Sequence, residues 1–228
     1  MTDIGAVIAI DGPAGSGKST ISRMVAERVG LPMLDTGAMY RAVTCAVLRS
    51  GGDVSDPDVA AAAAEGAVIV VDDVVTIDGA DVTTEIRGPE VSANVSIVAA
   101  HPGVRTHLRA MQRDWMARHG GGVLEGRDIG TVVLPDAPLK IYLTASPEVR
   151  AKRRAGDVQG DFDLAAAAAN IAERDRIDST REDSPLRPAD DAVIVDTSDL
   201  TIDEVVERIV SEARSRRLGR EASGKELL

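Results

Sequence analysis

The chain has 228 residues, 44% of them hydrophobic, which is enough to bury a substantial core. Its formal net charge of −11 at pH 7 argues against a protein that coats nucleic acid, because such binding uses a broad basic face. One tryptophan and one phenylalanine also exclude a broad aromatic platform for stacking single-stranded nucleic acid.

Cysteine usage and hydropathy favour a cytoplasmic protein without a membrane partner. No apolar run approaches the roughly 18 residues that cross a bilayer, and the stretch MTDIGAVIAID lacks a basic region and a cleavage site. The single cysteine, Cys45, cannot form an intramolecular disulfide, and its apolar surroundings predict a small buried side chain. We therefore expect neither export nor membrane insertion.

Strands and helices are expected to alternate along most of the chain, which predicts a doubly wound α/β fold. Continuously apolar segments, as a parallel sheet covered on both faces requires, predict core strands at 6–11, 32–35, 122–126, 139–145 and 192–198. Helices are expected at 18–29, about 37–49 with Thr36 as its N-cap, 89–100, 102–118, 146–155, 161–179 and 201–217.

Residues 67–88 break this alternation. The segment AVIVVDDVVTIDGADVTTEIRG is rich in β-branched side chains and is punctuated by Asp72-Asp73 and Asp78-Gly79. It predicts a small antiparallel meander, inserted between helices and forming its own lobe. The alanine run at 60–64 is expected to be helical, and the last residues, 218–228, are expected to be a flexible tail.

The stretch IAIDGPAGSGKST, residues 8–20, matches the phosphate-loop pattern G-x-x-x-x-G-K-[ST]. Glycines in such a loop let backbone N–H groups converge on phosphate oxygens, Lys18 reaches the outer phosphates, and Ser19 supplies an oxygen to Mg²⁺. The alternative is a tight turn that only resembles the motif, but the position between a strand and a helix disfavours it. A nucleoside triphosphate is expected to bind Gly12, Pro13, Ala14, Gly15, Ser16, Gly17, Lys18, Ser19 and Thr20.

A phosphate loop alone does not define a reaction, because GTPases, motor-like ATPases and small-molecule kinases all use one. The sequence has no N-K-x-D guanine motif, which weighs against a GTPase. Arg41 in DTGAMYR and Arg127 in EGRDIGT each follow a predicted strand, where a parallel sheet opens toward a ligand crevice. These arginines favour a kinase with an anionic acceptor.

Four separated motifs occur in order: IDGPAGSGKST, LDTGAMYRAV, EGRDIGTVVLPDAPLKIYLTAS and ERDRIDSTREDSPL. Together they resemble the bacterial cytidylate kinases, members of the nucleoside monophosphate kinase family, from about residue 4 to 212. The insert at 67–88 is similar to the enlarged acceptor lobe of the longer bacterial forms. Four motifs in the right order discriminate far better than the phosphate loop alone.

The resemblance implies a P-loop kinase fold and transfer of the γ-phosphoryl group of ATP, with Mg²⁺, to CMP or dCMP. It implies that Arg41 and Arg127 hold the acceptor phosphate, and that Arg174 and Asp178 contact the ribose. The cytosine pocket it implies consists of Ser96, Arg105, Asp128 and Arg181, with Thr36 and Tyr40 lining it. Thr36 replaces the more frequent serine but keeps the hydroxyl, and Glu125 stands where related kinases often have aspartate.

The resemblance also divides the chain. A core at 1–35 and 119–217 is expected to bind ATP, and residues 36–118 to form the acceptor lobe. A lid is expected at 146–160. The expected partners are the small molecules ATP and CMP or dCMP, and the protein is expected to be a monomer.

Two arginine-rich helices support an anionic site on physical grounds. Arg174, Asp178 and Arg181 are spaced i, i+4 and i+7, so they project from one face, although a surface salt-bridge ladder would look the same. In SPEVRAKRRAGD, Arg150, Arg153 and Arg154 also share a face. Such a run is usually a solvated surface or binds nucleic acid, but the resemblance to a nucleotide kinase implies the lid that closes over the phosphates. Lys18, Arg127, Arg153 and Arg154 are the expected catalytic residues.

No general base is expected, because the acceptor phosphate is already anionic and phosphoryl transfer depends on alignment and charge stabilisation. Two alternatives stay open. One is the same architecture with another acceptor, such as UMP, AMP or shikimate. The other is a nucleotide-dependent binding module, which would bind nucleotide without acceptor-dependent ADP production.

Overall fold

The computed structural model describes residues 6–156 and 164–218, without the side chains of 154–156. Its centre is a five-stranded parallel sheet in the order β2-β6-β1-β7-β8. The predicted α/β class with five parallel core strands is therefore confirmed. The strands are β1 (Val7–Asp11), β2 (Met33–Asp35), β6 (Gly122–Gly126), β7 (Leu139–Thr144) and β8 (Val193–Asp196).

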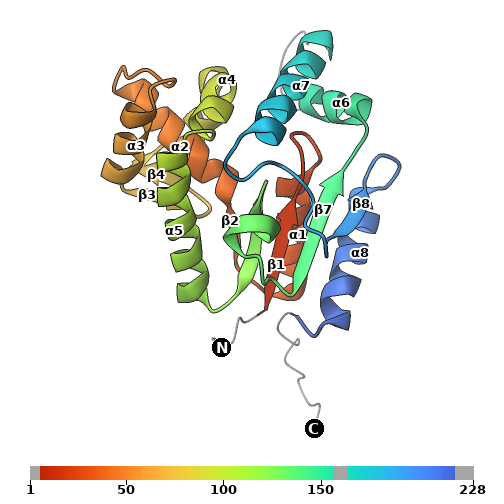
Figure 1. Ribbon diagram of the computed structural model, residues 1–228. Coiled ribbons are helices and arrows are strands. Elements are labelled where there is room, and N and C mark those ends of the chain that lie inside the picture. The colour runs from red at the N-terminus through yellow and green to blue at the C-terminus, as the bar shows by residue number, and fades with distance from the viewer. Residues whose placement is uncertain (1–5, 157–163, 219–228) are drawn as a thin grey trace.

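Helices cover both faces of this sheet (Figure 1). Side chains alternate along a strand, so β1 serves two cores: Val7 and Ala9 face one, Ile8 and Ile10 the other. The second core packs against α1 and α8. The helices are α1 (Lys18–Val29), α2 (Thr36–Arg49), α3 (Pro57–Gly66), α4 (Pro89–Val98), α5 (Pro102–His119), α6 (Pro147–Gly156), α7 (Leu164–Thr180) and α8 (Ile202–Ser215).

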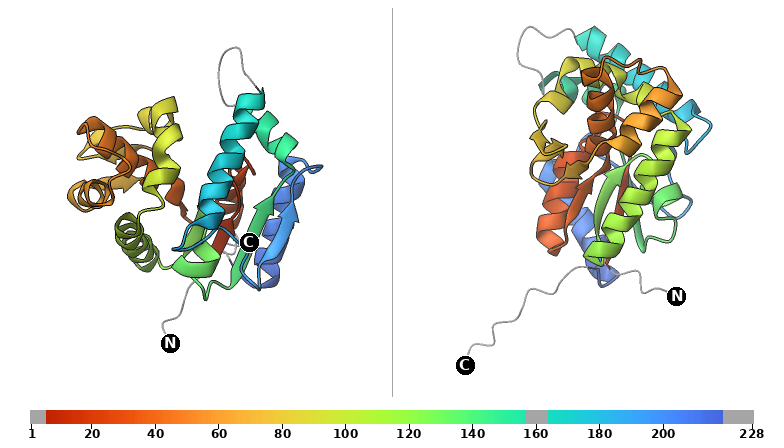
Figure 2. Two further views of the ribbon diagram at one scale, coloured as in Figure 1. Left: turned by 45° about the horizontal axis from the view of Figure 1, so that its top comes forward. Right: turned by 90° about the vertical axis from the view of Figure 1, so that its left-hand side faces the viewer.

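The expected meander forms a three-stranded antiparallel sheet of β3 (Ile69–Val71), β4 (Val75–Ile77) and β5 (Ala80–Asp81). Its strands end at Asp81, and a short 3₁₀ turn, Glu85–Arg87, follows. Inward-facing Ile69, Val75 and Ile77 join the core cluster that contains α2. Helices α2 to α5 and this small sheet lie to one side of the large sheet, whereas α6 and α7 lie above its carboxyl ends (Figures 1 and 2).

One local prediction is wrong: Thr36 does not cap α2. The N-cap is Asp35, whose carboxylate accepts the backbone N–H of Ala38 at 3.0 Å. Thr36 is already helical, and its hydroxyl donates instead to the carbonyl of Glu125 at 2.6 Å. This bond ties the first turn of α2 to the end of β6.

A π-helical turn, Ile129–Val133, follows β6 and was not expected. The buried carboxylate of Asp11 accepts the backbone N–H groups of Ile129 and Gly130, both at 2.8 Å. Asp11 therefore anchors this turn to the end of β1. Within 6–156 and 164–218, no helix is both long and apolar enough to cross a bilayer. The expected tail beyond Leu218 and lid residues 157–160 fall outside the described residues.

Candidate active site

A pocket of about 770 Å³ lies where the carboxyl ends of β1, β2 and β6 face α2, α4, α5 and α7. Two predicted loop residues, Gly12 and Pro13, do not line the pocket. The side chain of Arg154 is outside the described part. The other predicted site residues all line this pocket: Ala14, Gly15, Ser16, Gly17, Lys18, Ser19, Thr20, Thr36, Tyr40, Arg41, Ser96, Arg105, Arg127, Asp128, Arg153, Arg174, Asp178 and Arg181.

The phosphate loop connects β1 to α1 and depends on glycine at its first position. Gly12 has φ +154°, and a Cβ there would lie 2.1 Å from the carbonyl oxygen of Leu143 in β7. No side chain fits so close to a neighbouring strand. Gly17, in the left-handed region at φ 87°, then starts α1 and leaves the helix N-terminus open toward the pocket.

Lys18 folds over the loop from the first turn of α1. Its Nζ donates to the carbonyl of Pro13 at 2.6 Å and to the hydroxyl of Ser16 at 3.2 Å. Burial, followed by the nearby guanidinium of Arg127, lowers the pKa of Lys18 to about 7, although the carboxylates of Glu125 and Asp11 oppose this. A buried ammonium in this position gains most from an anionic ligand.

Glu125 ends β6 beside Lys18 and is nearly fully buried. Burial, with a smaller contribution from Asp35, raises the pKa of Glu125 to about 8, and a hydrogen bond from the Ser19 side chain acts in the opposite direction. Its Oε1 has no hydrogen-bond partner among the described residues. Hydroxyl and carboxylate oxygens suit Mg²⁺, and a cation bound beside Glu125 would favour its ionised form, so Ser19 and Glu125 fit a magnesium site at the loop.

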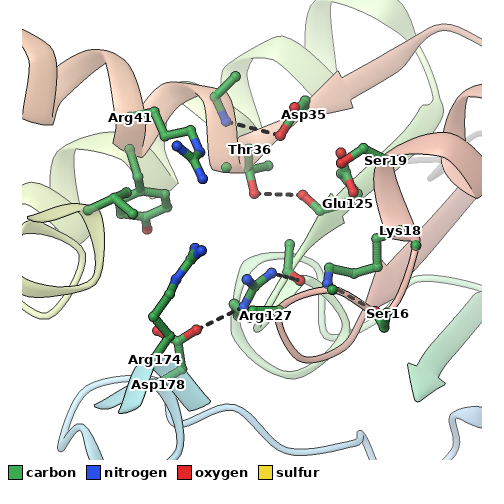
Figure 3. A pocket seen from close by; sticks show the side chains of 18 of the residues that line it. Ser16, Lys18, Ser19, Asp35, Thr36, Arg41, Glu125, Arg127, Arg174 and Asp178 are labelled. Atoms are coloured by element: carbon green, nitrogen blue, oxygen red, sulfur yellow. Dashed lines mark hydrogen bonds and ion pairs between the residues drawn. The ribbon is translucent and has the colours of Figure 1, made fainter. Parts of the chain in front are cut away.

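Arginines and aspartates alternate along the wall of the pocket beside α7, and Figure 3 shows the first pair, Arg127 and Asp178. Arg127 Nε donates to Asp178 Oδ2 at 2.9 Å, and the other oxygen of Asp178 lies 3.7 Å from Arg181. Arg181 in turn lies 3.7 Å from Asp128, which accepts a 2.6 Å bond from Arg105. Arg105 of α5, Arg127 and Asp128 after β6, and Asp178 and Arg181 at the end of α7 therefore form one continuous network rather than a surface ladder.

Two further pocket residues, Tyr40 and Arg41, are held by packing and local bonds. Tyr40 lies under Arg105, whose guanidinium carbon is 5.5 Å from the ring centroid, and burial raises the pKa of Tyr40 to about 12. Arg41 Nη1 donates to the carbonyl of Ile86 at 2.9 Å and the hydroxyl of Ser92 at 3.0 Å. In Figure 3, Arg41 and Arg174 point into the same space as Arg127 and Lys18.

Two arginines of the basic helix α6 face the phosphate loop instead of solvent. Arg150 is buried, and it donates to the carbonyl of Ala14 at 3.2 Å and pairs with Asp175. Arg153 donates to the hydroxyl and the carbonyl of Thr197 at 2.8 and 2.7 Å and to the carbonyl of Ser16 at 3.4 Å. Two of the arginines predicted to share a face thus contact the phosphate loop.

Asp175 is a residue that sequence reasoning missed. Its carboxylate accepts the backbone N–H of Ala14 at 3.2 Å, so it connects α7 to the phosphate loop across 161 positions. The quoted motif ERDRID contains it, but its position next to Arg174 places it off the face that carries the predicted residues. The histidines play no comparable part: His101 contacts the carbonyl of Val54, and His119 stacks on Trp115 at 4.1 Å.

The loop, the parallel sheet and the strand order define a P-loop nucleotide-binding protein of the small-molecule kinase type. Two solved structures share this fold: TT1252 from Thermus thermophilus (TM-score 0.52, 17% identity, 94% of this chain and 99% of that chain) and a gluconokinase from Sinorhizobium meliloti (TM-score 0.50, 16% identity, 93% of each chain). At these identities the similarity shows the fold alone.

The family follows from the sequence comparison. The family model for cytidylate kinase matches residues 8–215. A cytidylate kinase from Rhodococcus opacus is 52% identical over 219 residues, 92% of this chain and 95% of that protein. One from Corynebacterium efficiens is 50% identical over 229 residues, 95% of this chain and 99% of that protein. The chain belongs to the cytidylate kinase family.

Proposed function

We propose that this protein transfers the γ-phosphoryl group of ATP to CMP or dCMP, giving CDP or dCDP and ADP. Family membership and relatives at about 50% identity that carry the name cytidylate kinase support this activity. The observation that carries the proposal is that one pocket joins a phosphate loop to a separate cluster of arginines and aspartates. Such a pocket has room for a donor and an acceptor at once.

For the donor, we assign the phosphates of ATP to the loop Gly12–Thr20, where the N-terminus of α1 favours negative charge. Lys18 would exchange its bonds to Pro13 and Ser16 for phosphate oxygens. Arg153, which already contacts the loop, and Arg154 are proposed to stabilise the transferring group. The proposed lid is residues 146–160, closing over the core of 1–35 and 119–217.

For the acceptor, we assign the CMP phosphate to Arg41 and Arg127, because both guanidinium groups face the loop across the pocket. The ribose is assigned to Arg174 and Asp178. Residues proposed to read or line the base are Ser96, Arg105, Asp128, Arg181, Thr36 and Tyr40, most of which are buried. The acceptor lobe of 36–118 supplies the helices that carry Tyr40, Ser96 and Arg105.

Magnesium is proposed to accompany ATP, with Ser19 as its protein ligand and Glu125 as a neighbouring carboxylate. When bound, it neutralises charge on the β- and γ-phosphates.

The reaction needs no proton abstraction by the protein. An oxygen of the CMP phosphate forms a bond to the γ-phosphorus while the bond from that phosphorus to the β,γ-bridging oxygen breaks, and ADP leaves with the bonding electrons. Two multiply charged anions must approach each other for this step. Fixed guanidinium groups on both sides reduce their repulsion, and arginine suits the task because it never loses its charge.

We further propose that the protein works as a monomer in the cytoplasm. Its one cysteine, Cys45, is buried against the carboxylate of Glu85, and burial raises the pKa of Cys45 to about 11. A chain that cannot form an internal disulfide suits a reducing compartment.

The test is an ADP-release assay with Mg²⁺, ATP and a panel of acceptors: CMP, dCMP, UMP, AMP and shikimate. We expect rapid ADP release with CMP and dCMP only. Release driven by another acceptor would reassign the substrate. Tight ATP binding without acceptor-dependent ADP would instead favour a nucleotide-dependent binding module.

A further inference from the structure

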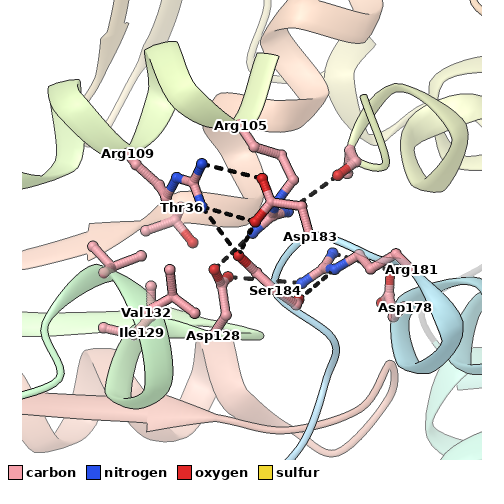
Figure 4. A network of polar contacts seen from close by, with 12 residues as sticks. Thr36, Arg105, Arg109, Asp128, Ile129, Val132, Asp178, Arg181, Asp183 and Ser184 are labelled. Atoms are coloured by element: carbon pink, nitrogen blue, oxygen red, sulfur yellow. Dashed lines mark hydrogen bonds and ion pairs between the residues drawn. The ribbon is translucent and has the colours of Figure 1, made fainter. Parts of the chain in front are cut away.

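A cluster of three side chains outside the pocket lining joins α5 to the segment that follows α7 (Figure 4). Arg109 donates from Nη1 and Nη2 to the two carboxylate oxygens of Asp183, at 2.9 and 3.1 Å. Nη1 also lies 3.2 Å from the hydroxyl of Ser184, which itself donates to Asp183 at 2.7 Å. Arg109 thus grips both residues of the turn with the fork geometry that only arginine offers.

The turn that carries Asp183 and Ser184 has an unusual backbone. Ser184 is buried and has φ 56°, a left-handed conformation that costs a non-glycine residue free energy. In that conformation its carbonyl accepts the Nε of Arg181 at 2.6 Å. The N–H of Leu186 bonds to the carbonyl of Asp178 at 2.7 Å and closes the turn. The strained turn therefore aims a carbonyl at a pocket arginine.

Asp183 also acts on the second pocket arginine. Its Oδ2 lies 3.9 Å from the Nε of Arg105, a buried atom without a hydrogen-bond partner among the described residues. The far end of the same guanidinium bonds to Asp128. Burial acts to raise the pKa of Asp183, but hydrogen bonds from Ser184 and Arg109 outweigh it, so the pKa lies below its ordinary value. The carboxylate therefore remains charged near neutral pH.

The Arg109–Asp183 pair holds pocket residues as well as the turn. The two side chains are only 19% and 27% exposed, and their two-point contact is stronger than an ordinary surface ion pair. The pair stabilises the strained turn, and through it Arg105 and Arg181 are held on either side of Asp128. An arginine fixed in one geometry binds a planar ligand with less loss of conformational entropy.

We propose that Arg109 and Asp183 are positioning residues that set the affinity for the acceptor base by fixing Arg105 and Arg181. This inference rests on the proposed CMP kinase activity, since it assigns these two arginines to the base. It predicts that loss of the clasp, defined as Arg109, Asp183 and Ser184, weakens acceptor binding and leaves the donor site intact.

The experiment compares Asp183→Asn with Asp114→Asn, a control at an aspartate that also pairs with an arginine and lies on α5, the helix that carries Arg109. Asp114 pairs with Arg118 at 2.9 Å, but both side chains are about two-thirds exposed and lie outside the pocket. We expect Asp183→Asn to raise the KM for CMP and its calorimetric Kd about tenfold, which corresponds to about 1.4 kcal/mol. The KM for ATP should stay within about twofold, and the control should change neither constant.

Variants of Arg109 provide a second, independent test. Arg109→Met should reproduce the loss, and Arg109→Met combined with Asp183→Asn should be no worse than either alone, because both remove the same contact. Arg109→Lys, which keeps the charge but not the fork, should retain part of the CMP affinity. If Asp183→Asn does not fold, the lysine variant carries the test.

The outcomes separate the two proposals. A wild-type protein that makes no CDP overturns the proposed function. An active wild type whose CMP constants are unchanged in Asp183→Asn and Arg109→Met overturns the positioning role. Equal losses toward CMP and ATP, together with a lower melting temperature, would show that the clasp only supports the fold, and they overturn it as well.

Discussion

The guanidinium of Arg105 meets the carboxylate of Asp128 at 2.6 Å, with only 1% and 5% of the two side chains exposed. Desolvating both charges consumes much of what their attraction provides, so such a pair is weak evidence for stability. Arg105 is held further by the carbonyl of Ala99 at 3.1 Å and by the ring of Tyr40 beneath it. The position of the Arg105–Asp128 pair in the pocket wall therefore favours a role in recognising a polar ligand over a role in stabilising the fold.

Asp128→Ala is therefore expected to weaken CMP binding much more than ATP binding. It leaves Arg105 buried without its main partner, so the free energy of unfolding should also fall, by about 3 kcal/mol. Steady-state kinetics with each substrate varied in turn, alongside thermal unfolding, measure both effects. Asp191→Ala is the control, because its carboxylate also pairs with a cation, Lys140, but is exposed and outside the pocket. A loss confined to ATP would contradict the assignment.

The predicted residues that line the pocket could be found from the sequence because each belongs to a short motif of neighbouring positions. A phosphate loop places its glycines and Lys18 within a few positions, and strand ends place Arg41 and Arg127 at the crevice. What sequence could not supply is the partner of each charge. Asp175 reaches Ala14 across 161 positions and Arg109 reaches Asp183 across 74, and no periodicity predicts such pairs.

The wrong N-cap of α2 has the same origin. Asp35 and Thr36 are adjacent, and both residue types cap helices well. The Thr36 hydroxyl donates to the carbonyl of Glu125, 89 positions away, so Asp35 is the residue that caps the helix. The turn at Ile129–Val133 was likewise missed because the group that anchors it, Asp11, lies on another strand.

Lys18→Ala should abolish most activity without harming the fold. Removing one preorganised charge from a transferring group costs roughly 100- to 1,000-fold in turnover. The folded protein, however, loses a cation whose pKa burial lowers to about 7, and alanine is a good helix former at the start of α1. We therefore expect kcat to collapse while the melting temperature is maintained or rises.

Lys140→Ala is the matched control for this variant, because Lys140 is also mostly buried but pairs with Asp191 away from the pocket. It should retain kcat and lose some stability. Normal turnover in Lys18→Ala would contradict the proposal that Lys18 binds the phosphates of ATP. A lower melting temperature without loss of turnover would make that lysine structural.

Asp11 gives a prediction for pH, because burial raises its pKa from 3.8 to about 6, against the opposing effect of the N–H groups of Gly130 and Ile129. A raised pKa means that the folded state binds the proton more tightly. The stabilising effect of this proton is therefore complete below pH 3.8 and is lost as the pH rises through about 6. The shift corresponds to about 3 kcal/mol.

Replacing Asp11 with asparagine removes this titration, so the wild-type stability minus the Asp11→Asn stability should fall between pH 4 and pH 7. Urea unfolding at intervals of pH, analysed as this difference, isolates the one carboxyl from all others. Asp81→Asn serves as the control: a hydrogen bond from Thr83 lowers the pKa of exposed Asp81, so its difference should be flat over the same range. If the Asp11 difference is equally flat, or grows with pH, the buried carboxyl is ionised throughout and its bonds to the Ile129 turn outweigh its burial.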